Sequence, residues 1–223
     1  MEETPKKDFS AIGQDILFAA RNELYLNLPY LDVALCSLRF QPGGGVTLSL
    51  ATDGETLYYD GSVLAERYLR SRTAVNRAYL HVLLHCMLRH IFKKRGKVPE
   101  LWDLACDAAV ESILDELEYA CLTEGTVPMK QKFYGQCRRD MPVLTAEGIY
   151  RRLLRISLPD YELAQLQRAF LVDDHGLWDP EKREDQEQRQ QQDQKWRDLS
   201  GKTRTGLETV LAGQAAGGEA VLE

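Results

Sequence analysis

Two histidines on one predicted helix, His81 and His85, are the residues of this sequence best suited to hold a metal ion. The segment from about residue 73 to residue 92 has apolar residues at helical spacing, so positions 81 and 85 leave the same face about one turn apart. Two imidazoles so placed can bind one zinc ion. The alternative is a pair of hydrogen-bonded core histidines, because leucines surround both. Three of the chain's four histidines fall between positions 81 and 90, which favours the metal site.

Val82 occupies the position at which this kind of site needs a catalytic base, so metal binding and catalysis must be considered separately. In active zinc peptidases, the residue after the first histidine is a glutamate, which takes a proton from the attacking water and passes it to the leaving amine. Valine can do neither, although the glutamate is not itself a ligand. If hydrolysis persists, Glu111 is one candidate for a substitute base, because it follows Asp107 by one helical turn.

A zinc site needs a third protein ligand, and two residues compete for that place. Asp107 comes 22 residues after His85, a spacing that suits a second helix folding back beside the first. It lies among small apolar residues, where a buried carboxylate needs a cation or hydrogen-bond donors. The alternative is that Asp103, Asp107 and Glu111 form a solvated acidic stripe. His175 is the rival third ligand, and the sequence does not rank it against Asp107.

His90 is predicted to face away from the metal site. It lies five residues after His85, which corresponds to a rotation of about 140° around a regular helix. Unless the helix has already unwound before residue 90, we therefore expect it to cap the carboxyl end of the helix instead of binding metal.

The remaining patterns predict a mainly helical α+β domain with a small antiparallel sheet. Apolar periodicity and capping residues indicate helices, and alternating apolar residues on either side of an Asp-Gly turn indicate a β-hairpin. The connections 123–142 and 172–180 show no period. Helices are expected at about 8–26, 62–70, 73–92, 101–117, 145–156 and 160–171, and the hairpin strands at 46–50 and 56–59.

Composition and charge exclude several classes of function. Hydrophobic residues make up 44% and charged residues 28% of the chain, as in soluble globular proteins, and the net charge is -6. An acidic chain is a poor ligand for a nucleic-acid backbone, and no glycine-rich phosphate loop is present. No secretory signal or membrane-spanning run is apparent, so we expect a cytoplasmic protein with no membrane or nucleic-acid partner.

The predicted division of the chain falls near residue 180. Residues 8–180 contain the periodic segments and form the expected domain. From residue 181 to residue 195 nearly every side chain is charged or glutamine, which indicates a solvated helix or a linker. We expect residues 181–223 to lead to a further C-terminal domain.

The order of several short motifs resembles a bacterial metallopeptidase-related domain that precedes a von Willebrand A-like domain in proteins often associated with AAA+ ATPases. The resemblance covers about residues 10–210. Its pieces are His-Val-Leu-Leu-His at 81–85, Trp-Asp-Leu-Ala-Cys-Asp at 102–107, Glu-Gly-Ile-Tyr at 147–150, Asp-His-Gly-Leu-Trp at 174–178, Trp196, and Thr-Gly-Leu-Glu at 205–208.

This resemblance implies a zincin-like fold and a zinc cofactor. His81 and His85 match the family's His-Glu-x-x-His ligands, while Asp107 and His175 stand at motif positions that would complete a site. It also implies a protein partner, either an AAA+ ATPase or a von Willebrand A-like domain of the same protein. Val82 departs from the family pattern.

The leading hypothesis is a zinc-binding, metallopeptidase-like domain that is impaired as a hydrolase and serves as a scaffold or regulatory module. Two alternatives remain open. One is a metal-free helical interaction module in which His81 and His85 are core residues. The other is an active zinc peptidase with a substitute base.

Overall fold

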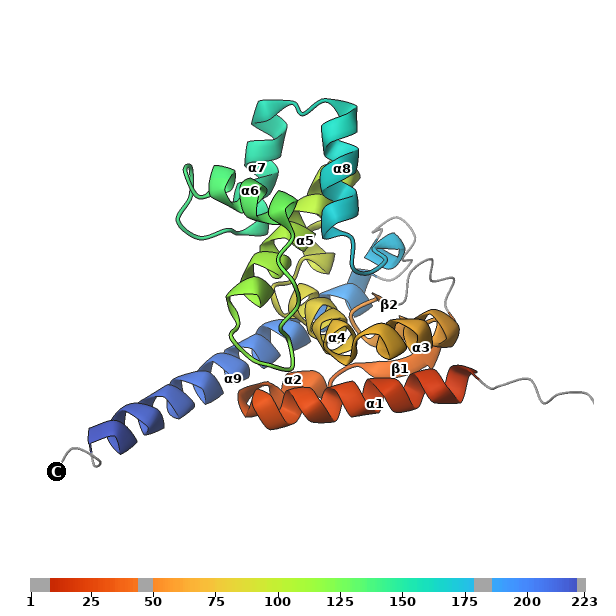
Figure 1. Cartoon of the computed structure of the whole chain (residues 1–223), viewed down its shortest axis with the longest axis vertical. Helices are drawn as coiled ribbons and strands as arrows, with labels where there is room; N and C mark the ends of the chain where they lie inside the picture. Colours follow the sequence, from red (N-terminus) through yellow and green to blue (C-terminus); the bar gives the residue numbers. More distant parts are fainter. Residues whose placement is uncertain (1–8, 44–49, 179–185, 220–223) are drawn as a thin grey trace, which may run out of the picture.

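A computed structural model describes residues 9–43, 50–178 and 186–219, and it confirms the predicted class of a mainly helical α+β fold with a small sheet. Helices occupy most of this part of the chain (Figure 1). In chain order the elements are α1 (Phe9–Asn27), η1 (Pro29–Leu31), α2 (Asp32–Leu35), β1 (Arg39–Pro42), β2 (Leu50–Thr52), β3 (Thr56–Tyr59), α3 (Gly61–Arg70), α4 (Arg72–Met87), η2 (Ile91–Lys93), α5 (Pro99–Glu116), α6 (Pro128–Cys137), α7 (Ala146–Ile156), α8 (Asp160–Phe170), η3 (Gly176–Trp178) and α9 (Gln186–Glu219).

Helix α4, which carries His81 and His85, lies at the centre of the molecule (Figure 1). The Ser71 hydroxyl caps its amino end by accepting a hydrogen bond from the Ala74 backbone N–H. All residues from 75 to 83 are buried, because α1, α3, α5, α9 and β2 all pack against this helix. The two histidines are therefore interior residues with no exposed surface.

Helix α4 ends at Met87, earlier than the predicted end near residue 92. Arg89 adopts a left-handed conformation with φ 63°, which a regular helix does not allow. The backbone N–H groups of Arg89 and His90 then donate to the carbonyls of Cys86 and His85. This is the hydrogen-bond pattern of a Schellman cap, and it turns the chain back on the helix. A bidentate ion pair from Arg89 to Asp193 holds the turn against α9.

Helix α5 packs beside α4 and presents Asp107 and Glu111 to it. Pro99 occupies the first turn, where the missing N–H costs nothing. Buried alanines at positions 105, 108 and 109 have short side chains, which allow the neighbouring helices α4, α7 and α8 to pack closely against α5. Asp107 and Glu111, one turn apart, both reach His81.

The sheet has three strands in the order β1-β3-β2 and is mixed. Strands β2 and β3 pair antiparallel around the predicted turn, where Gly54 has φ 89° and the Asp53 side chain accepts hydrogen bonds from two backbone N–H groups. Strand β1 pairs with β3 in the parallel direction, which the antiparallel prediction did not include. The first predicted hairpin strand, 46–50, lies almost wholly outside the described residues.

The outer edge of β2 carries the segment that follows α8. Ala51 and Asp174 form a parallel bridge, and the Asp174 N–H donates to the Leu50 carbonyl at 2.9 Å. Trp178, fully buried two residues after Gly176, anchors the other end of this short segment. The sheet edge thus fixes residues 173–178 over the carboxyl-terminal part of α4.

From Gln186 onward, the charged segment near the carboxyl end is helical and is attached to the domain. Helix α9 buries Trp196, whose indole N–H donates to the Gly54 carbonyl at 2.6 Å, and it contacts η1, α2 and α4. Its second half extends away from the other elements (Figure 1). The predicted domain boundary near residue 180 therefore precedes a helix that packs on the same core.

Candidate metal centre

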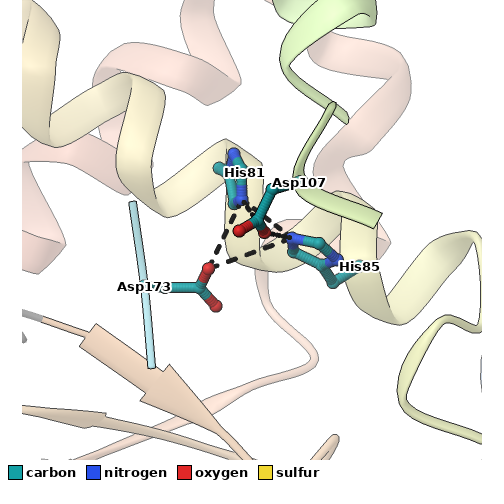
Figure 2. A group of neighbouring side chains, drawn as sticks. All are labelled: His81, His85, Asp107 and Asp173. Carbon is teal, nitrogen blue, oxygen red and sulfur yellow. Dashed lines mark hydrogen bonds and ion pairs between the residues drawn. The ribbon is translucent and has the colours of Figure 1, made fainter. Parts of the chain in front are cut away.

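Four buried side chains from three parts of the chain converge at one point. His81 and His85 come from α4, Asp107 from α5 and Asp173 from the segment after α8 (Figure 2). One potential ligand atom from each residue lies within 4.8 Å of all the others. All four residues are at most 5% exposed. Buried carboxylates and imidazoles in such a group require a cation or shared protons.

Three of the distances between these atoms equal the ligand spacing of a small tetrahedral ion, one is shorter and one is longer. Atoms bound tetrahedrally at about 2.0–2.1 Å from zinc lie roughly 3.3 Å from one another. His81 Nε2 is 3.4 Å from both Asp107 Oδ1 and Asp173 Oδ1. His85 Nε2 is 3.3 Å from Asp107 Oδ1, 3.9 Å from Asp173 Oδ1 and 2.8 Å from His81 Nε2. The residues present therefore fit a zinc-sized cation.

Asp107 lies where the sequence predicted it, whereas Asp173 was missed. Asp107 is brought to the two histidines because α5 returns along α4, as the 22-residue spacing required. The position of Asp173 depends on the bridge between Ala51 and Asp174, which joins residues far apart in sequence. The one local signal was its place directly before the Asp-His-Gly-Leu-Trp motif.

His175 lies beside the four-residue group. Its Nε2 atom is 3.2 Å from Asp107 Oδ1 and 3.1 Å from Asp173 Oδ1, the same two oxygens that face the α4 histidines. The ring stacks on Trp178 with a centroid distance of 3.5 Å. His175 can therefore donate a hydrogen bond to the carboxylates or add a fifth ligand, the third nitrogen of the group.

Glu111 lies on the opposite edge of the His81 ring from the converging atoms. Its Oε1 is 2.8 Å from His81 Nδ1, while Oε2 accepts hydrogen bonds from Arg77 and Lys130. Both carboxylate oxygens are thus engaged away from the point where the ligand atoms meet. This geometry does not favour the predicted role of substitute base.

His90 lies outside the four-residue group, as expected, but its side chain turns back to the outer edge of the His85 ring. The left-handed Arg89 returns the chain toward α4, so His90 Nδ1 lies 3.0 Å from His85 Nδ1. The exception that the sequence left open applies, because the helix has already ended at Met87. Each α4 histidine thus has one ring nitrogen toward the centre and the other held by a buried partner.

Within this cluster, protonated histidines and ionised carboxylates carry opposite charges that stabilise each other. Burial alone would lower the pKa of His81 and of His175, but the neighbouring carboxylates outweigh burial and raise both pKa values well above the usual value. Burial alone would raise the pKa of Asp107 and Asp173, but the histidines hold both well below their usual range. Burial and the positive His81 lower the pKa of His85 to about 4. The two ionised carboxylates, Asp107 and Asp173, are thus paired with positive charge on His81 and His175.

Val82 belongs to the hydrophobic core and is fully buried. No carboxylate stands at the position where active peptidases of this type keep their general base. The four-residue group itself borders a cleft of about 470 Å³, whose lining includes Asp107, Asp173 and His175 together with Lys94, Glu100, Asp103 and Gln167. A small ligand in this cleft would reach the edge of the cluster.

The chain thus combines a helical α+β core with a buried group of two histidines and two aspartates that could hold a metal ion. A family model described as "Putative metallopeptidase domain" matches residues 14–220, and the chain belongs to that family. No curated protein and no solved structure matched in the corresponding comparisons. Within the described ranges, no helix combines the length and apolar character needed to cross a bilayer.

Proposed function

We propose that this domain binds one zinc ion through His81, His85, Asp107 and Asp173, and that it is impaired as a hydrolase. The observation that carries the proposal is the convergence of four buried ligand atoms within 4.8 Å of one another, with three of their separations at the value of a tetrahedral zinc site. Two carboxylates neutralise the charge of a divalent cation. The two neutral imidazoles complete an oxygen and nitrogen donor set that suits zinc.

The number of protein ligands supports a structural role for the ion. Structural zinc sites are closed by four protein side chains, whereas catalytic sites keep one position for water. Zinc bound in a site with an open position would act as a Lewis acid. Here the four residues already supply a full tetrahedral set, and Val82 supplies no base. The ion would fasten α4, α5 and the 173–178 segment to one another.

We propose that the zinc-loaded domain acts as a scaffold or regulatory module for a protein partner. The family to which the chain belongs supports a metallopeptidase-like origin. By resemblance, the partner is an AAA+ ATPase or a von Willebrand A-like domain joined to α9. The cytoplasm is the compartment that this assignment favours.

The zinc content of the purified protein tests the metal site. Protein prepared without a nickel column should contain about one zinc per chain by elemental analysis, as expected for one tetrahedral site. His81→Ala should lose it. Asp103→Asn is the matched control, because Asp103 lines the cleft outside the four-residue group and should keep the metal. A wild-type protein free of metal after incubation with zinc would instead support the metal-free interaction module.

An active peptidase is the second candidate, and the cleft beside Asp107, Asp173 and His175 is the observation that favours it. This candidate predicts cleavage of unfolded peptides that a chelator abolishes and that Val82→Glu increases. Because position 82 is buried, the variant must first be shown to be folded by circular dichroism. We expect no cleavage by the wild-type protein. Chelator-sensitive turnover would contradict the proposed impairment.

A further inference from the structure

The Glu111 carboxylate holds the first histidine of the metal centre by the nitrogen that faces away from the other ligand atoms. Its Oε1 lies 2.8 Å from His81 Nδ1, and Glu111 is 1% exposed. A carboxylate accepts, so Nδ1 carries the proton and donates it to Glu111. In a neutral imidazole this leaves the lone pair on Nε2, which is the atom that faces His85, Asp107 and Asp173.

Two cations, the buried Arg77 and the partly buried Lys130, fix Glu111 in turn. Its Oε2 accepts hydrogen bonds from Arg77 Nη2 at 2.8 Å and from Lys130 Nζ at 2.6 Å. Arg77 belongs to α4 and Lys130 to α6, so the Glu111 carboxylate on α5 accepts hydrogen bonds from two other helices. The Glu111 carboxylate is thus held by three hydrogen bonds, two of them from positively charged groups.

The second histidine of the centre has a different kind of partner. His85 Nδ1 lies 3.0 Å from His90 Nδ1, an imidazole nitrogen. His90 is an imidazole and carries no negative charge with which to accept a hydrogen bond from His85. A carboxylate raises the basicity of the imidazole it holds more than a neutral ring does. Of the two histidines, His81 thus has the stronger orienting partner.

We propose that Glu111 is a positioning residue of the metal centre that acts through His81, fixing the tautomer and ring orientation in which Nε2 faces the ion. This inference depends on the zinc site proposed above. It replaces the expected role of Glu111 as a base with one that requires no contact with substrate. Arg77 and Lys130 support the role by keeping the acceptor charged and in place.

The zinc affinity of Glu111 variants tests this role. Removing such an orienting partner typically costs 10–100-fold in metal affinity. Glu111→Ala should therefore weaken zinc binding roughly 10–100-fold in competition with a chromogenic chelator. Glu111→Gln keeps an acceptor oxygen of the same shape, and we expect it to recover part of that loss. The visible absorption of the cobalt-substituted protein should change in Glu111→Ala, since the orientation of a ligand changes.

Asp115→Asn is the matched control for this experiment. Asp115 also accepts from Arg77 Nη2, at 2.5 Å, but the structure gives it no contact with His81. It should leave both the zinc affinity and the cobalt spectrum close to wild type. Equal weakening by Asp115→Asn and Glu111→Ala, or unchanged affinity in folded Glu111→Ala and Glu111→Gln, would overturn the positioning role. A wild-type protein that binds neither zinc nor cobalt would overturn the metal site itself.

Discussion

Replacing Asp173 with asparagine lowers the affinity for zinc by roughly 100-fold or more, the largest single-residue effect expected outside the two α4 histidines. Structural zinc sites are worth about 10–16 kcal/mol, so one of four ligands contributes roughly 3 kcal/mol, which corresponds to about 100-fold. The asparagine has nearly the same volume but lacks the negative charge. Chelator competition on Asp173→Asn and the wild-type protein measures the difference.

Two neighbours of Asp173 serve as comparisons. Asp174→Asn should retain wild-type affinity, because Asp174 lies outside the four-residue group and is held to the sheet through its backbone. His175→Ala separates the two candidate ligands that the sequence left unranked. A modest loss in His175→Ala with a large loss in Asp173→Asn would identify Asp173 as the ligand. The reverse order would assign the fourth place to His175.

Removing the metal should lower the melting temperature by on the order of 10 °C. A ligand present at 1,000 times its dissociation constant stabilises the folded state by about 4 kcal/mol, and for a chain of this size each kcal/mol shifts the midpoint by roughly 2–4 °C. Metal-free protein keeps two ionised carboxylates buried with only shared protons to balance them. Calorimetry of the wild-type protein with and without chelator measures this shift.

Treating the Asp173→Asn variant with the same chelator distinguishes the loss of the ion from other effects of the chelator on the melting temperature. The Asp173→Asn variant should melt at a lower temperature and respond less to the chelator. Limited proteolysis adds a local measurement, because metal-free protein should be cut more readily between residues 171 and 178. Identical melting curves and identical cleavage with and without chelator would show that no ion fastens this segment.

Local sequence patterns were enough to predict the parts of the site that depend on single helices. His81 and His85 follow from the i, i+4 geometry of one helix, and Asp107 from the return of the next helix along it. The mainly helical fold follows from periodicity in the same way. These features need no knowledge of how distant segments pair.

The features that were missed depend on single backbone conformations or on long-range pairing. Arg89 in a left-handed conformation redirected His90, and no sequence rule requires an arginine to adopt it. Asp173 reaches the centre through a bridge between positions 51 and 174. The parallel pairing of β1 with β3 likewise joins residues that no local pattern relates. Predicting any of these three features requires knowledge of the tertiary structure.

The bridge at the edge of β2 has a mechanical consequence. The Gly54 carbonyl, in the turn that ends this strand, accepts the Trp196 indole N–H of α9, and the strand's other end holds the backbone of Asp174. The long helix that projects from the domain is thus joined through one turn and one three-residue strand to the neighbour of Asp173. A force that pulled α9 outward would act on this strand through Trp196 and on the end of α4 through the Arg89–Asp193 ion pair, and both connections lead to elements that carry or adjoin the four-residue group.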